Sequence, residues 1–304
     1  MSLDALHKLR RGLIWPKAVP SRSHWLVALA SLIGAASFLY PFLLPAVTAR
    51  AASPHAADAP LLFAAITALC LIAIAAAFEG DSAARRSPAK TVALLGVLVA
   101  IDATLRLVPT FLGASPIFLL IILTGAVFGP VFGFQMGALT LLVSAFLTGG
   151  VGPWLPFQML GAGWMGLTAG WLPRSSSPRR RLVMLAAFGA GWGFLFGAIL
   201  NLWSWPFTAP GASEAVGLYW APGLSFRETL ERYAAFYLTT SLVYDLFRAA
   251  GNAALVLALG APALRVLERY HDRFGWEPWT EAAPSPTRSG PTSTGQTTAP
   301  QTTS

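Results

Sequence analysis

The sequence predicts an all-α membrane protein whose helices form a polytopic bundle. Of its 304 residues, 55% are hydrophobic and only 11% are charged, and the mean hydropathy is +0.59. An ordinary soluble domain has about 25% charged residues, so this chain carries too few charges to cover a globular surface. Several apolar runs also reach the length of about 20 residues that a helix needs to cross a bilayer. The composition therefore argues against a water-soluble enzyme.

Eight segments are expected to span the membrane. They are residues 25–44, 61–78, 91–108, 116–128, 130–148, 154–172, 182–202 and 233–260. The fourth and fifth meet at Gly129-Pro130, where glycine permits a tight turn and proline favours the first turn of a helix. We expect a helical hairpin there, because the combined apolar run is too long for one crossing.

The distribution of basic residues predicts the orientation. If the N-terminus is cytoplasmic and eight helices alternate, sixteen Lys and Arg residues lie on the cytoplasmic side and three lie outside. The positive-inside rule then places both termini in the cytoplasm. We expect the protein to lie in the plasma membrane. We expect 1–24 to be a basic cytoplasmic segment and 25–44 to be an uncleaved helix, because its apolar run is longer than a signal-peptide core. Residues 277–304, rich in Pro, Ser and Thr, are expected to form a disordered cytoplasmic tail.

The chain offers little catalytic chemistry. Its four histidines lie outside the predicted spans, none of its three lysines lies within a span, and Cys70 is its single cysteine. These residues provide neither a metal site nor a catalytic triad, and no phosphate-binding G-x-x-x-x-G-K-[ST] motif is present. We therefore predict a protein without catalytic residues, metal or cofactor that does not itself hydrolyse ATP.

Small residues recur at four-residue spacing, which in membranes marks surfaces where helices approach closely. Three series are expected to pack within the bundle: Gly125, Gly129, Gly133 and Gly137; Ala162, Gly166 and Gly170; and Gly189, Gly193 and Gly197. Two further pairs at this spacing, Ala89 with Ala93 and Gly96 with Ala100, place small residues along the cytoplasmic half of one face of the third span. This last face could equally receive a helix from another protein.

Charged residues occur inside two spans, where they are costly and often functional. Asp102 and Arg106 lie in the third span, and Asp245, Arg248 and Asn252 share a face of the last one. With a rise of about 1.5 Å per residue, Asp102 comes level with Arg248, and Arg106 with Asp245. We therefore predict a neutral cluster of four charges, which either joins the two helices or binds a ligand.

Aromatic residues gather at the expected outer face, between residues 201 and 237. Such residues commonly anchor a helix at the membrane boundary. Asn201 continues the glycine face of its helix, however, and Gln158 lies one turn below Trp154. Aromatic walls with a few polar groups form pockets for flat organic ligands, so a pocket that opens outward is the alternative interpretation.

Four segments carry a resemblance to a known family. They are Ala93-Leu-Leu-Gly-Val-Leu-Val-Ala-Ile-Asp102, Gly129-Pro-Val-Phe-Gly-Phe-Gln-Met-Gly-Ala138, Gly150-Val-Gly-Pro-Trp-Leu-Pro-Phe-Gln-Met159 and Asp245-Leu-Phe-Arg-Ala-Ala-Gly-Asn252. In their order and spacing, residues 91–276 resemble the substrate-binding S component of energy-coupling factor (ECF) transporters. The pair of spans within residues 25–90 is additional to the usual six-helix core.

The resemblance implies a subunit that captures a micronutrient, usually a vitamin, from outside. Transport would need a transmembrane coupling (T) component, met by the face that includes Ala89, Ala93, Gly96 and Ala100, and two cytoplasmic ATPases. The ligand would lie among residues of the outer loops and the last three helices. These are Trp154, Gln158, Asn201, Trp203, Tyr237 and Tyr244, and the charged positions Asp102, Arg106, Asp245, Arg248 and Asn252 are added as candidates. The aromatic content suits a flavin, a thiamin-like ring or a corrinoid, with cobalamin as one hypothesis.

Two other functions fit parts of the sequence. A self-sufficient secondary transporter or channel for a small organic solute could use Asp102 and Asp245 as coupling carboxylates, although each has an arginine nearby. An intramembrane lipid-processing enzyme lacks an evident base or nucleophile.

Overall fold

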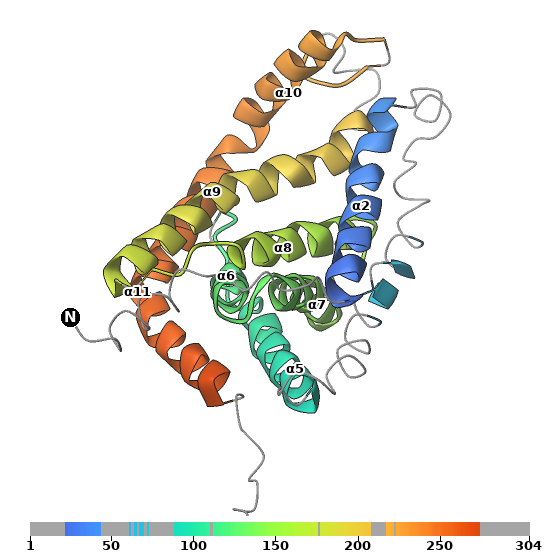
Figure 1. Cartoon of the computed structure of the whole chain (residues 1–304). Helices are drawn as coiled ribbons and strands as arrows, with labels where there is room; N and C mark the ends of the chain where they lie inside the picture. The colour runs from blue at the N-terminus through green and yellow to red at the C-terminus, as the bar shows by residue number, and fades with distance from the viewer. Residues whose placement is uncertain are drawn as a thin grey trace, which may run out of the picture.

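The computed structural model describes residues 22–43, 61, 64–65, 67–69, 72, 88–109, 112–175, 177–207, 217–221 and 223–273. Within these ranges the chain forms a bundle of helices (Figure 1). The helices are α2 (Arg22–Leu43), α5 (Pro88–Leu105), α6 (Ile117–Phe128), α7 (Pro130–Thr148), α8 (Leu155–Ala169), α9 (Pro178–Ser204), α10 (Phe226–Thr240) and α11 (Leu242–Arg273). A short 3-10 helix, η2 (Trp205–Phe207), continues α9. The predicted all-α class is therefore confirmed.

Several expected spans coincide with observed helices. The segments 25–44, 91–108, 116–128, 130–148, 154–172 and 182–202 correspond to α2 and to α5 through α9. The second expected span, 61–78, lies mostly outside the described residues, as do the basic N-terminus and the C-terminal tail.

The hairpin predicted at Gly129-Pro130 is present. Helix α6 ends at Phe128, and Gly129 has φ 99° and ψ 177°, a backbone conformation that residues other than glycine rarely adopt. Pro130 then opens α7, where its missing N–H costs no helical hydrogen bond.

The prediction of one helix over 233–260 is wrong. The chain breaks at Ser241 (φ −120°, ψ −28°), so α10 ends at Thr240 and α11 begins at Leu242. Helix α10 extends away from the helices α5 to α8 (Figure 1), and Phe236 is its single buried residue. Ser225 and Glu228 form a capping box at its start, and the hydrogen bonds from Ser225 lower the pKa of the Glu228 carboxyl.

The core is built around α6, whose residues Ile121, Ile122 and Leu123 are fully buried. Helices α7 and α8 approach so closely that a Cβ on Gly133 would lie 2.2 Å from the carbonyl oxygen of Gly166. Such close backbone approach explains the small-residue series on these helices.

Helix α2 packs across the outside of this core. The ring of Phe38 meets the ring of Phe157 on α8 edge-on, with centroids 4.8 Å apart. Phe42 lies near Trp205, with ring centroids 5.9 Å apart. Aromatic contacts of this kind stabilise helix packing beyond the burial of area alone. The N-terminal helix is thus held against α8 and η2.

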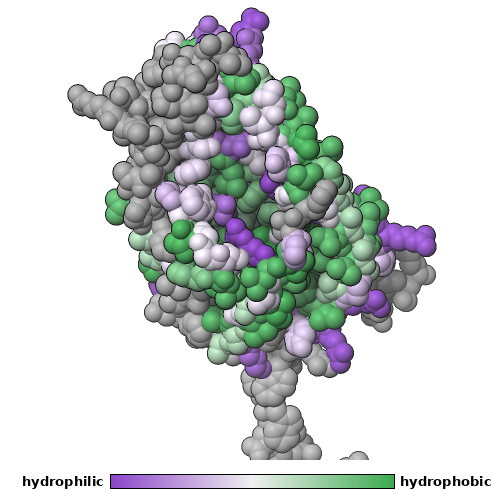
Figure 2. Space-filling view, turned by 180° about the vertical axis from the view of Figure 1, so that it is seen from behind, coloured by the Kyte–Doolittle hydropathy of each residue, from purple (hydrophilic) through white to green (hydrophobic). Residues whose placement is uncertain are grey.

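The outer surface of the bundle is largely apolar. Leu32, Val97, Leu195 and Leu257 are among many large hydrophobic side chains that are about half exposed or more, and hydrophobic residues cover much of the face shown in Figure 2. By length and composition, α2, α7, α9 and α11 can each cross a membrane. The chain is therefore a multi-pass membrane protein.

Candidate substrate-binding cavity

A cavity of about 370 Å³ lies among the α5–α6 loop and helices α6, α7, α8, α9 and α11. Its polar lining comprises Arg106, Ser115, Thr148, Gln158 and Arg248, and its other walls are Gly113, Ile117, Phe118, Leu141 and Phe196. Helices that are far apart in the sequence thus contribute side chains to one cavity. The face in Figure 2 is hollowed, and hydrophilic side chains lie in the hollow.

Arg248 is fixed by several contacts. It forms an ion pair with Asp245 one turn earlier on α11, and its Nη1 donates to the carbonyl oxygen of Gly193 at 3.2 Å. The guanidinium also lies over the ring of Phe196, 5.4 Å from the centroid, as in a cation–π contact. Asp245 is 1% exposed. The positive charge of Arg248 is thus matched by a buried carboxylate.

Arg106 has a different environment. It follows the last residue of α5, and its Nη1 donates to the Ser144 hydroxyl at 3.0 Å, which in turn donates to the carbonyl oxygen of Leu141 at 3.1 Å. No carboxylate among the described residues forms an ion pair with Arg106. Asp102, one turn earlier on α5, is bonded to Thr140 instead, so Arg106 has no ion-pair partner in the part of the chain that the structure describes.

Two other polar atoms at the cavity lack partners. Gln158 Oε1 and the Ser115 hydroxyl are buried, and neither has a hydrogen-bond partner within the described ranges. Unsatisfied buried polar groups are rare because each costs free energy. Both residues line the cavity, so a bound molecule could satisfy them.

The predicted cluster of four charges is not formed as one unit. Asp102 is fully buried against α7, where it accepts a hydrogen bond from the Thr140 hydroxyl at 3.1 Å, and it does not line the cavity. Asp102 lies at about the same depth in the membrane as the prediction placed Arg248. Its side chain points from α5 towards α7, however, where it meets Thr140. The structure therefore groups Asp245 with Arg248 and separates both from Asp102.

Asn252 also has a structural contact. Its Nδ2 donates to the carbonyl oxygen of Gly189 at 2.9 Å, one turn along the same glycine face that receives Arg248. A Cβ on Gly197 would lie 2.0 Å from the Asp245 carboxylate. The glycine series of α9 is thus the surface on which the polar residues of α11 rest.

The aromatic candidates and Asn201 lie outside the cavity lining. Trp154 is 40% exposed and meets Trp203 edge-on, with ring centroids 6.4 Å apart. Asn201 donates to the Ser241 hydroxyl at 2.7 Å, at the break between α10 and α11. Tyr237 has an enclosed hydroxyl next to Asp245, whereas Tyr244 is half exposed. Ligand contacts by these residues remain predictions.

Sequence reasoning missed several lining residues. Ser115 follows a loop that no periodicity describes, and its nearness to Arg106 in sequence is the only available signal. Phe196 lies on α9 between Gly193 and Gly197, so its proximity to the α11 arginine could have been expected from the glycine face. Phe118 and Leu141 look like ordinary core residues in the sequence.

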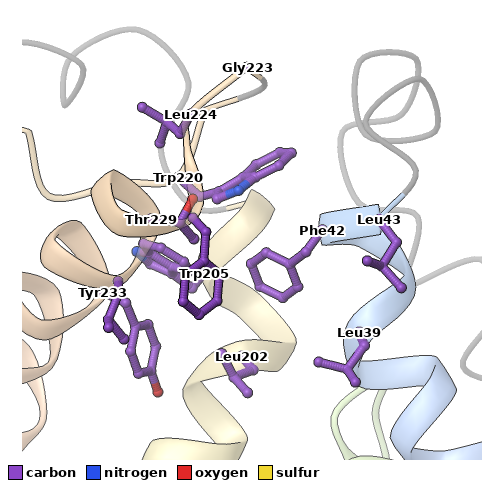
Figure 3. A pocket seen from close by; sticks show the side chains of 12 residues that line it. Leu39, Phe42, Leu43, Leu202, Trp205, Trp220, Gly223, Leu224, Thr229 and Tyr233 are labelled. Carbon is purple, nitrogen blue, oxygen red and sulfur yellow. The ribbon is translucent and has the colours of Figure 1, made fainter.

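A second cavity, of about 480 Å³, lies between α2 and the α9–α10 region. Figure 3 shows Phe42 and Leu39 of α2 facing Trp205, Trp220 and Tyr233. No charged side chain lines it among the described residues. Binding sites usually combine apolar walls with a few convergent polar groups, so the cavity with the arginines is the better candidate.

A multi-pass helical bundle with a partly polar cavity among its helices is the architecture of a membrane protein that binds a small solute. The comparison with known families agrees. The family model for the ECF transporter, substrate-specific component matches residues 90–260, more than half of the chain. The chain therefore belongs to this family, which consists of substrate-binding subunits of transporters rather than enzymes. No curated protein and no solved structure matches the chain.

The match confirms the resemblance found in the sequence. It begins two residues into α5 and leaves α2 outside. Substrate-specific components act in a transporter that also contains a T component and ATPases.

Proposed function

We propose that this S component captures a small vitamin-like micronutrient in the cavity lined by Arg106, Gln158 and Arg248. Its T component and two cytoplasmic ATPases would then drive uptake. The observation that carries the proposal is the convergence of these three polar side chains, from the start of the α5–α6 loop, from α8 and from α11, on one cavity with apolar walls. Specific small-molecule sites have this composition.

The size of the cavity restricts the ligand. Its volume of about 370 Å³ lies at the lower end of the range of about 300–1,000 Å³ that is typical of small-molecule pockets. A molecule with one or two rings suits this volume better than a corrinoid. The cavity therefore favours a smaller micronutrient over cobalamin.

We propose that the cavity faces outward. Arg106, Ser115 and Thr148 lie where α5 ends, α6 begins and α7 ends. The opposite end carries basic residues: Arg174 donates to the carbonyl oxygen of Val127, near the end of α6, at 3.0 Å, and Arg181 pairs with Glu268. The positive-inside rule assigns the basic end to the cytoplasm, together with both termini.

The exposed face of α5 supports a contact with the T component. Ala89, Ala93, Gly96 and Ala100 are exposed, and a Cβ on Gly96 would have no atom within 4 Å. Small residues on an open face permit close approach by another helix in lipid. This surface and the cavity lie at different places along α5, so their functions can be separated experimentally.

The test uses proteoliposomes that contain the full chain with its T component and ATPases. Mass spectrometry first identifies the compound that co-purifies with the chain, and ATP-dependent uptake of that compound is then measured. We expect Gly96→Leu to stop uptake while leaving binding intact, and Gln158→Ala to weaken binding. Gly191→Leu is the matched control, because Gly191 is also exposed with no atom within 4 Å of a Cβ.

Two outcomes would contradict the proposal. The first is uptake by the chain alone under an ion gradient, which would identify a secondary transporter. The second is unchanged binding in Gln158→Ala combined with weakened binding in Asn201→Ala, since Asn201 lies outside the cavity lining.

A further inference from the structure

We infer that the substrate is an organic monoanion, a small carboxylate whose charge is balanced by Arg106. The inference rests on the proposed function, because it takes the cavity with Arg106 and Arg248 as the substrate site. It adds the chemical class of the ligand, which membership of the family does not specify.

The charges around the cavity carry the first step. Two guanidinium groups line it and no Asp or Glu does so among the described residues. Asp245 neutralises Arg248 through a direct ion pair, whereas no described carboxylate pairs with Arg106. Asp102, one turn before Arg106, is bonded to Thr140 and does not line the cavity, so the cavity lining retains one guanidinium without an ion-pair partner. Such a charge is costly unless it has a counter-ion, and a bound carboxylate supplies one.

The remaining hydrogen-bond donors carry the second step. A guanidinium has five N–H donors, and the described contacts of Arg106 use one of them, to Ser144. A carboxylate accepts a pair of parallel N–H bonds from such a group. Arg248 is fixed by Asp245 and Gly193, so its orientation towards the cavity does not depend on the ligand.

The net charge distinguishes a carboxylate from a phosphate. A phosphate monoester carries about −1.5 to −2 at neutral pH, which would leave excess negative charge after Arg106 is neutralised. A carboxylate brings the site to zero. The charge balance with Arg106 that favours an anion therefore also favours one negative charge over two.

The rest of the lining describes the remainder of the ligand. Gln158 Oε1 is a buried acceptor without a partner among the described residues, so it calls for an N–H or O–H donor on the ligand. Phe118 and Phe196 form apolar walls. Their rings are edge-on to one another, with centroids 5.0 Å apart. The expected molecule has a carboxylate, an apolar body and a separate hydrogen-bond donor.

The experiment measures binding of three matched probes to the purified, ligand-depleted full chain. Benzoate, benzamide and phenyl phosphate share one ring and differ in charge, and binding is followed by the shift of the thermal unfolding midpoint. We expect benzoate to bind about tenfold or more tightly than benzamide, as a charge-assisted hydrogen bond implies, and more tightly than phenyl phosphate. Arg106→Gln should reduce the benzoate preference to about twofold or less, with Arg106→Lys keeping part of it.

A second measurement does not depend on any probe. Without ligand, Arg106→Gln should raise the unfolding midpoint, because it removes an unbalanced charge from the membrane region. Arg227→Gln is the control, since Arg227 is exposed on α10 and pairs with Glu231. It should neither raise the midpoint nor change the preference for benzoate.

Equal affinities for benzoate and benzamide, including no binding of either, would overturn the inference. So would a benzoate preference that survives in Arg106→Gln, or tighter binding of phenyl phosphate. These failures are distinct from failure of the proposed function. If benzoate and benzamide bind equally while Gln158→Ala still weakens binding of the co-purified compound, the cavity remains the substrate site and only the charge assignment is lost.

Discussion

Substitution of Gly133 by alanine tests the close packing of α7 against α8. A Cβ on Gly133 would lie 2.2 Å from the carbonyl oxygen of Gly166, and a Cβ on Gly166 would lie 2.0 Å from that of Gly133. The obstructing atoms belong to backbone, which cannot rotate away as a side chain can. Ordinary contact begins near 3.4 Å, so the two helices must part by roughly 1 Å at this point.

The cost can be estimated from the packing on both sides of the contact. Overpacking of a core typically costs about 1–3 kcal/mol. Here the movement also opens the neighbouring contact, where a Cβ on Gly137 would lie 2.2 Å from the carbonyl oxygen of Ala162. Alanine has a higher helix propensity than glycine, which offsets about 1 kcal/mol of this cost. With a gross cost at the upper end of the overpacking range, about 3 kcal/mol, the expected net loss is about 2 kcal/mol.

The free energy of unfolding is measured by titration with sodium dodecyl sulfate in mixed micelles. Gly96→Ala is the matched control, because Gly96 is also in an apolar helix and has no atom within 4 Å of a Cβ. Its stability should stay level or rise by about 1 kcal/mol. Equal stabilities of Gly133→Ala and Gly96→Ala would refute the reasoning, since they would show that α7 and α8 do not touch through their glycines.

Three further outcomes follow from particular contacts. Thr140→Val removes the hydroxyl bound to Asp102 and should lower the free energy of unfolding by about 1–3 kcal/mol; Thr168→Val, whose hydroxyl bonds within its own helix, should change it less, and the reverse order would contradict the burial of Asp102. Gly113→Ala should weaken binding of the co-purified compound several-fold, because Gly113 has φ +86° at the cavity wall; unchanged binding would argue against this loop as part of the site. Ser225→Ala removes a helix cap and should cost about 1 kcal/mol, seen as faster amide exchange in the first turn of α10; unchanged exchange would argue against the capping box.

The fold could be predicted where local signals and length agree. At Gly129-Pro130, two residues with strong backbone preferences interrupt an apolar run too long for one crossing, and the hairpin is present. At Ser241 neither glycine nor proline marks the break, and apolar residues continue on both sides of it. A break set by tertiary packing, such as the hydrogen bond from Asn201 to Ser241, leaves no local signal.

The candidate site could be predicted only in part. Arg106, Gln158 and Arg248 stand out because polar groups are rare in apolar helices, and all three line the cavity. Asp102 stands out for the same reason, yet it is turned towards Thr140. Depth along a helix follows from residue number, whereas the direction of a side chain depends on how neighbouring helices pack. The apolar lining, such as Phe118, cannot be distinguished from core in the sequence.

Helix α5 joins two parts of the molecule that the proposed transport cycle must coordinate. Its exposed alanine and glycine face lies nearer the basic end, and Arg106 follows directly after its last residue, Leu105. A tilt of α5 caused by a docked partner helix would therefore move the guanidinium relative to Arg248 without any loop in between. On this view, the distance between the two arginines reports whether the transporter is assembled, and a pair of labels on α5 and α11 would follow it during turnover.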